Sequence, residues 1–154
     1  MRKKVTTPFA LPIPGFGESP LTSEDFERAC AREGIAVRRE RIPDETARGY
    51  YSPGGGSPFI VIDARLRGRR KLLAEFHELA HHFLHGWRHD FRSELAWERL
   101  GGKRHYTPRQ EWAEMQADAA ALLAVAPGLS LPAVVRFLLP ELSMTQTRGK
   151  EGTR

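Results

Sequence analysis

The spacing of hydrophobic residues predicts one strong helix near the middle of the chain, over residues 69–85. Apolar residues recur there at intervals of three and four positions, which is the period of an amphipathic helix packed on a core. They are Leu72, Leu73, Phe76, Leu79, Ala80, Phe83 and Leu84. Gly86 is the expected end of this helix, because glycine readily adopts the left-handed conformation that terminates helices.

Further helices are predicted from capping residues and periodicity. Thr22 or Ser23 can cap a helix that ends at Gly34. Pro108 is expected in the first turn of another helix, with Thr107 before it as the N-cap. Including two shorter helices, the ranges predicted on either side of the central helix are 23–33, 93–100, 108–126 and 130–139.

Three short β-strands complete the predicted secondary structure. They occupy residues 35–39, 49–52 and 59–63, and the glycine- and proline-rich run SPGGGSP separates the second from the third. This pattern indicates a small antiparallel sheet with a hairpin. Together with the helices it predicts an α+β fold, in which the sheet packs on a helical core.

The composition is that of a single folded domain. Of the 154 residues, 40% are hydrophobic, which is enough for a core, and 28% are charged, which is ordinary for a soluble surface. We expect an extended proline-rich arm over residues 1–20, the domain over 21–141 and a flexible tail over 142–154. No stretch is apolar enough to cross a bilayer and no signal peptide is recognisable, which predicts a cytoplasmic protein without a membrane partner.

The cysteine and histidine content restricts the metal chemistry open to this chain. Cys30 is the only cysteine, which excludes an intramolecular disulfide and a thiolate zinc site of the CxxC type. Any metal must therefore be held by histidine and carboxylate side chains. Five of the six histidines lie between His77 and His89.

Residues 77–81 read His-Glu-Leu-Ala-His, an HExxH motif inside the predicted central helix. At about 100° per residue, His77 and His81 are about 40° apart around the helix and can bind one metal ion together. Glu78 is placed beside them, where it can accept a proton from metal-bound water without binding the metal. Zinc held by three protein ligands lowers the pKa of its water to about 7, so this arrangement is typical of amide hydrolysis.

A third ligand is expected from the helix predicted at 108–126. Glu111, Glu114 and Asp118 lie on one side of it. Glu114 is favoured, because Asp118 follows one turn later and can accept the outer N–H of a ligating histidine. Glu111 stays an alternative third ligand, and a solvated acidic face is the non-functional interpretation. Against that interpretation, Asp118 stands among alanines, where a carboxylate needs a partner.

Two segments of the chain carry a family resemblance. They read GYYSPGGGSPFIVIDARLRGRRKLLAEFHELAHHFLHG and EMQADAAALLAVAP. Both are similar to the ImmA/IrrE family of metallo-endopeptidases, the first in its hairpin, basic turn and HExxH helix, the second in the signature ExEAxxFAxxLLxP. Gln116 replaces the second acid of that signature and Ala120 replaces its phenylalanine. The resemblance covers about residues 22–140.

The resemblance implies a zincin-like HExxH helix and a zinc-dependent endopeptidase. In such an enzyme His77, His81 and Glu114 would bind Zn²⁺, and Glu78 would be the catalytic base. The implied substrate is a specific intracellular protein, a DNA-binding repressor or antitoxin-like regulator. The alternative is a metal-stabilised module that sequesters such a regulator without cleaving it, and the intact Glu78 argues against this alternative.

Other polar residues near the motif are expected to have lesser roles. His85 is interpreted as a hydrogen-bonding neighbour or a cation at the helix end, because three imidazoles on one straight helix cannot converge on a single zinc. His82 is expected at the surface. His105 and Tyr106 could stabilise a tetrahedral intermediate, against the simpler interpretation of ordinary loop residues.

The net charge of +5 is concentrated just before the central helix. A basic run there could attract nucleic acid or an acidic partner. Direct nucleic-acid binding is not favoured, because no aromatic residues are interleaved with the charges. A solvated turn is the preferred interpretation of this run, which comprises Arg65, Arg67, Arg69, Arg70 and Lys71.

Overall fold

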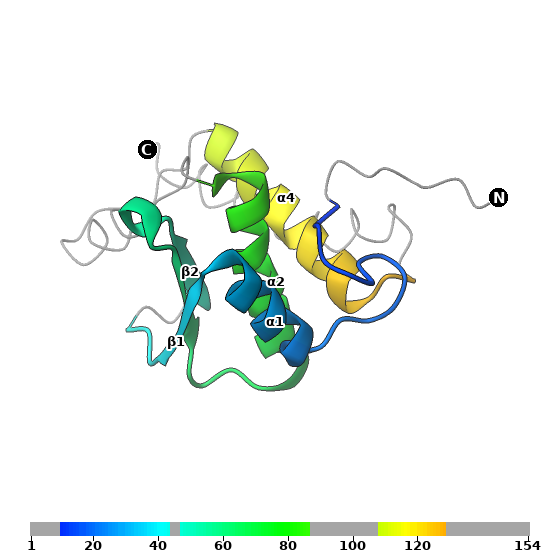
Figure 1. Ribbon diagram of the computed structural model, residues 1–154, viewed down its shortest axis with the longest axis horizontal. Coiled ribbons are helices and arrows are strands. Elements are labelled where there is room, and N and C mark those ends of the chain that lie inside the picture. Colours follow the sequence, from blue (N-terminus) through cyan, green and yellow to red (C-terminus); the bar gives the residue numbers. More distant parts are fainter. Residues whose placement is uncertain (1–9, 44–46, 87–107, 129–154) are drawn as a thin grey trace, which may run out of the picture.

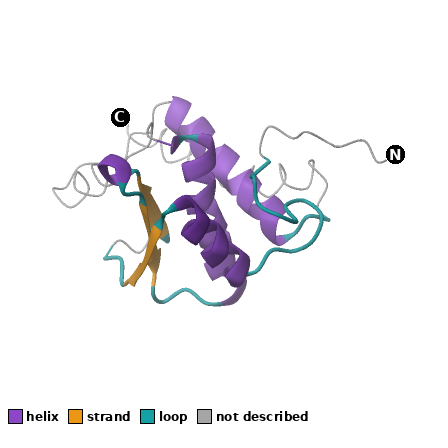
Figure 2. Cartoon of the chain, viewed as in Figure 1, coloured by secondary structure: helices purple, strands orange, loops and turns teal. Residues whose placement is uncertain are grey.

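A central helix lies between a small β-sheet and a second long helix (Figure 1). The computed structural model describes residues 10–43, 47–86 and 108–128. Helices and strands occupy separate parts of the molecule (Figure 2), which confirms the predicted α+β fold. The described elements are α1 (Ser23–Glu33), β1 (Ala36–Glu40), β2 (Gly49–Ser52), the 3-10 turn η1 (Gly54–Gly56), β3 (Phe59–Asp63), α2 (Gly68–Leu84) and α4 (Pro108–Val125).

The three described strands form one mixed sheet in the order β1-β3-β2. β2 and β3 pair antiparallel as predicted, with Tyr51 opposite Ile60, but β1 pairs with β3 in parallel, with Val37 opposite Ile60. The prediction of an entirely antiparallel sheet is therefore wrong for β1. Strand directions still alternate along the chain, but β3 is inserted between β1 and β2. All five residues of β3 are buried, as is typical of a strand at the centre of a sheet.

Helix α1 begins and ends where the sequence predicts. Thr22 Oγ1 accepts a hydrogen bond of 3.3 Å from the Asp25 N–H, and Asp25 Oδ2 accepts one of 2.8 Å from the Thr22 N–H. This reciprocal pair satisfies two of the backbone donors at the helix start. Gly34 ends the helix with φ 68°. Cys30 lies on the buried face of α1, so its assignment to the core is confirmed.

Helix α2 is buried well beyond its predicted apolar face, because α1, the sheet and α4 all contact it. The polar residues Glu75, Glu78 and His81 are buried along with Phe76 and Leu79. Buried polar groups are stable only with partners. The polar residues of α2 must therefore be accounted for by specific contacts.

Glu75 has such partners on the side of α2 that faces α1 and β1. Its Oε1 accepts a hydrogen bond of 2.7 Å from Ser23 Oγ, and its Oε2 accepts one of 3.0 Å from Arg39 Nη2. The side chain of Glu75 has no exposed surface. The ion pair with Arg39 and the hydrogen bond from Ser23 together link α2 to β1 and α1, which fixes the position of α2 relative to the sheet.

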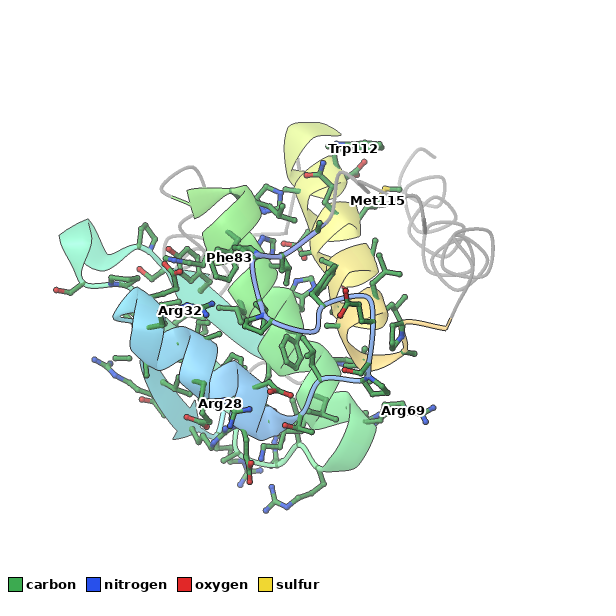
Figure 3. The ribbon with its side chains drawn as sticks, turned by 45° about the vertical axis from the view of Figure 1, so that its right-hand side comes forward. Arg28, Arg32, Arg69, Phe83, Trp112 and Met115 are labelled. Carbon is green, nitrogen blue, oxygen red and sulfur yellow. The ribbon has the colours of Figure 1, made fainter. Side chains whose placement is uncertain are left out.

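Helix α4 packs on α2 through small side chains. Helix axes approach closely where the residues between them are small, which brings polar side chains of one helix within reach of the other. Trp112, which is 57% exposed, and Met115 point away from α2 (Figure 3). The buried alanines of α4 are Ala113, Ala117, Ala119, Ala120, Ala121 and Ala124.

The described part of the predicted N-terminal arm packs on the core. Residues 12–19 form bends and turns, and Leu11, Ile13 and Leu21 are buried. The N–H of Leu21 donates a hydrogen bond of 2.9 Å to the carbonyl of Ala124 at the end of α4. Residues 10–20 are therefore not extended as predicted, because their apolar side chains are buried against the helices.

Several predicted features lie outside the described residues. They are the helices at 93–100 and 130–139, the first nine residues of the arm and the tail at 142–154. The proposed domain boundaries at 21 and 141 stay predictions. Among the described helices, none is long and apolar enough to span a membrane.

Candidate metal centre

His77 and His81 lie one turn apart on α2 with their Nε2 atoms facing each other. The two Nε2 atoms are 3.1 Å apart. The side chain of His81 is fully buried, and that of His77 is 16% exposed. The helical spacing of the motif therefore brings both imidazoles to one point, as the sequence predicts.

Glu114 reaches the same point from α4. Its Oε2 lies 3.0 Å from His77 Nε2, and its Oε1 lies 3.2 Å from His81 Nε2. One ligand atom from each of the three side chains falls within 4.8 Å of the others. Glu111, the predicted alternative, is exposed on α4 and is not part of this group.

The electrostatics of the three side chains suit a cation. Burial acts to raise the pKa of Glu114, but the adjacent imidazoles of His77 and His81 hold it well below its ordinary range, so the carboxylate is anionic. Burial, opposed only in part by Glu114, lowers the pKa of His81 to about 4 and keeps its ring neutral. Burial also acts to lower the pKa of His77, but the carboxylates of Asp118 and Glu114 raise it well above its ordinary value. Positive charge is thus stabilised where these groups meet.

The polar atoms at this point fit a divalent metal ion. Glu114 Oε1 is buried and accepts no hydrogen bond in the described part of the chain. Such an atom carries a cost of desolvation that a bound cation removes. Two imidazoles and one carboxylate are ligands suited to zinc and to other first-row transition metals.

Asp118 contacts the outer side of His77. Its Oδ1 lies 2.7 Å from His77 Nδ1. A carboxylate accepts hydrogen bonds only, so His77 Nδ1 carries the proton and its Nε2 is directed at Glu114. Asp118 and Glu114 thus lie at opposite nitrogens of His77, and the division of roles between them stays a prediction.

Glu78 points into the same region from the next position of α2. Its Oε1 lies 3.9 Å from His77 Nε2, and its Oε2 is buried with no hydrogen-bond partner among the described residues. Burial raises the pKa of Glu78 to about 8; His77 opposes this shift, and Glu114 and Asp118 add to it. This carboxyl group can therefore exchange a proton near neutral pH.

Gly49 at the start of β2 makes room for Glu78, a feature that the sequence analysis missed. A Cβ atom at Gly49 would lie 3.3 Å from Glu78 Cγ and 2.7 Å from the carbonyl oxygen of Val61. Only glycine fits between these two groups. A glycine inside a strand is a sequence signal for close backbone approach, although it does not say what approaches.

His82 and His85, at the C-terminal end of α2, also have hydrogen-bond partners. His85 Nδ1 lies 2.9 Å from His81 Nδ1, which confirms its interpretation as a hydrogen-bonding neighbour. His82 is half-buried with Nδ1 2.9 Å from the Tyr51 hydroxyl, so its predicted surface position is wrong. It is partly covered because Tyr51 of β2 and Glu33 at the end of α1 both contact its ring. His105 and Tyr106 lie outside the described residues.

Comparison with known proteins gives the family. A model of the family Peptidase_M78, the IrrE N-terminal-like domain, matches residues 30–126. The match spans both the HExxH helix and Glu114. No curated protein and no solved structure matches the chain significantly. Because the family model covers more than half of the sequence, the chain belongs to the ImmA/IrrE family of peptidases with an IrrE N-terminal-like domain.

Proposed function

We propose that this protein is a zinc-dependent endopeptidase in which His77, His81 and Glu114 bind the metal and Glu78 is the catalytic base. Peptidase activity follows from the family. One observation carries the finer assignment. The ligand atoms of three side chains converge within 4.8 Å, directly beside a buried carboxylate whose Oε2 has no partner among the described residues.

The donor set supports zinc as the metal. Zinc sites of hydrolases commonly use two histidines and one glutamate, and they leave a position for water. When bound, zinc would act as a Lewis acid that lowers the pKa of a water molecule and polarises the scissile carbonyl. The anionic Glu114 and the neutral His81 are in the protonation states that such binding requires.

Glu78 supplies the proton transfer of the proposed reaction. Its Oε2 takes a proton from the attacking water, whose oxygen forms a bond to the carbonyl carbon of the peptide. The same carboxyl group then returns the proton to the peptide nitrogen as the C–N bond breaks. A general base works best when its pKa is near the working pH, and burial brings the pKa of Glu78 to about 8.

Asp118 has a positioning role in this proposal. By accepting the Nδ1 proton of His77 at 2.7 Å, it holds the ring in the orientation that directs Nε2 inward. The substrate is proposed from the family resemblance to be a DNA-binding repressor or antitoxin-like protein. The cytoplasmic location also stays a proposal.

The proposed function is tested by comparing the wild type with Glu78→Gln, which preserves size and removes the base. Each zinc-loaded protein is incubated with an extract of the host cells, and new protein N-termini are identified by chemical labelling and mass spectrometry. We expect defined new termini only with the wild type. Identical termini with both proteins, when both hold zinc, would contradict an endopeptidase and favour the sequestering module.

A further inference from the structure

A chain of hydrogen bonds starts on the outer side of His81. His81 Nδ1 lies 2.9 Å from His85 Nδ1, and His85 Nε2 lies 2.9 Å from Gln116 Oε1. The chain passes from α2 to α4. It occupies for His81 the place that Asp118 occupies for His77, but it consists of an imidazole and an amide instead of one carboxylate.

The proton positions along this chain follow from its acceptor end. An amide oxygen has no hydrogen, so Gln116 Oε1 accepts from His85 Nε2–H. With its ring proton on Nε2, His85 has a lone pair at Nδ1, and this atom accepts from His81 Nδ1–H. As a result His81 Nε2 keeps its lone pair, and this is the atom that lies 3.2 Å from Glu114 Oε1.

If every hydrogen bond of this chain ran in the opposite direction, His81 could not bind a metal through Nε2. If the amide of Gln116 were turned by 180°, its NH₂ would donate to His85, and every proton in the chain would move to the other partner. His81 would then carry its proton on Nε2, where metal binding needs a lone pair. A carboxylate at position 116 could only accept, so it would allow the first order alone.

The backbone holds His85 in place for this contact. Its N–H donates a hydrogen bond of 2.9 Å to the carbonyl of His81 at the end of α2. Gly86 follows with φ 50°, a left-handed conformation that lets the chain leave the helix directly after His85. Because His81 is fully buried, its tautomer is set by protein groups.

We propose that His85 and Gln116 are positioning residues that hold His81 in the tautomer with a proton on Nδ1, which leaves Nε2 for the metal. The inference rests on the proposed metal site. It assigns to Gln116 the function of a hydrogen-bond acceptor and to His85 that of the link between helices. Neither residue binds the metal.

The proposal is tested first on the zinc-free wild type, by the ¹⁵N chemical shifts of labelled histidine in two-bond correlation spectra. We expect the Nδ1–H tautomer at His81. The Nε2–H tautomer would overturn the proposal. This readout is independent of zinc and of catalysis, so the proposal can fail while the proposed function stands.

The second test measures the dissociation constant for zinc by competition with a chelator. We expect His85→Ala and Gln116→Met to weaken zinc binding by about 10- to 100-fold, as is usual when a hydrogen-bond partner of a ligand is lost. Gln116→Glu, which keeps an acceptor, should bind within about threefold of the wild type or more tightly. Glu111→Gln, an exposed position on the same helix, is the matched control and should show no change.

Two outcomes of that titration would overturn the proposal. One is wild-type affinity in Gln116→Met or His85→Ala. The other is equal weakening by Gln116→Glu and Gln116→Met, which would mean that packing and not the acceptor matters. If the wild type itself binds no zinc, the proposed function fails, and that result is distinct from either outcome. Thermal unfolding of the zinc-free variants shows which of them keep the fold.

Discussion

Asp118 Oδ1 lies 2.7 Å from His77 Nδ1, so that a carboxylate of α4 fixes the ring of a proposed ligand on α2. Glu114, one turn earlier on the same helix, meets the opposite nitrogen of that ring at 3.0 Å. His77 is therefore held from both sides by a single helix. The docking of α4 on α2 brings Glu114 and Asp118 to His77, so changes at that contact should alter the proposed metal binding.

Asp118→Ala should weaken zinc binding by about 10- to 100-fold, because His77 loses the acceptor that directs its Nε2 inward. Asp118→Asn, whose amide oxygen can still accept, should have a smaller effect. Competition with a chelator measures both constants. If the Asp118→Ala variant bound zinc as tightly as the wild type, the role assigned to this residue would be contradicted.

Glu78→Gln should lose about 10²- to 10⁴-fold in cleavage rate and keep zinc, because the amide cannot take the proton of water. The measurement is the rate at which fragments of an identified substrate appear, together with the zinc content of the variant. Loss of zinc in parallel with loss of activity would instead make Glu78 a ligand.

Gly49→Ala should destabilise the protein by about 1–3 kcal/mol, because its Cβ would meet the Val61 carbonyl oxygen at 2.7 Å. It should also slow cleavage by pressing on Glu78 Cγ. Gly128→Ala is the matched control, since nothing lies within 4 Å of that position and its φ is not positive. Urea unfolding gives the stabilities. Equal stability of the two variants would contradict the close approach at Gly49.

The Asp63–Arg65 pair should make stability depend on acidic pH. Hydrogen bonds from Arg65 lower the pKa of Asp63 to about 2, while an unfolded aspartate has a pKa of about 4. A carboxylate whose pKa is lower in the folded state than in the unfolded state stabilises the folded protein. This contribution is complete at pH values above the unfolded pKa, and it is lost as the pH falls from about 4 towards 2.

Asp63→Asn tests that dependence, because it removes the charge and nearly preserves the shape. Unfolding free energies of the wild type and the variant are compared at pH 6 and at pH 2.5. We expect the difference between them to be larger at pH 6. An equal difference in unfolding free energy at pH 6 and at pH 2.5 would rule out the ion pair as the source of the pH dependence.

Cys30 should be unreactive in the folded protein. Its side chain is buried, and this burial raises the pKa of the thiol to about 12, so hardly any thiolate forms at neutral pH. A chromogenic disulfide reagent should label it only after addition of denaturant. Labelling of the native protein at the denatured rate would show that the face of α1 that carries Cys30 is not buried in the core.

The sequence predicts the helices and strands more accurately than it predicts how they are arranged in space. The boundaries of α1 follow from Thr22 and Gly34, whose local chemistry decides where the helix starts and stops. The parallel pairing of β1 with β3 could not be predicted, because strand order depends on which strand is inserted at the centre, and this is set by contacts distant in sequence.

The candidate metal site shows the same contrast between features that local sequence predicts and contacts that depend on the whole fold. His77, Glu78 and His81 follow from helical spacing, and Glu114 with Asp118 from a one-turn spacing on a second helix. The approach of Gly49 to Glu78 and the contact of Gln116 with His85 depend on how separate elements dock. The spacing of residues within a single segment gives no information about such contacts. The turns at residues 12–19 are not predictable for a similar reason, since the side chains of Leu11 and Ile13 belong to a core built from helices distant in sequence.

The central claim is that His77, His81 and Glu114 form one zinc centre. Its most direct test is the zinc content of the protein purified without a histidine tag, measured by mass spectrometry of the metal. We predict about one zinc per chain in the wild type and in Glu111→Gln, and almost none in His81→Ala. A wild type without zinc, or a His81→Ala variant that retains it, would contradict the account.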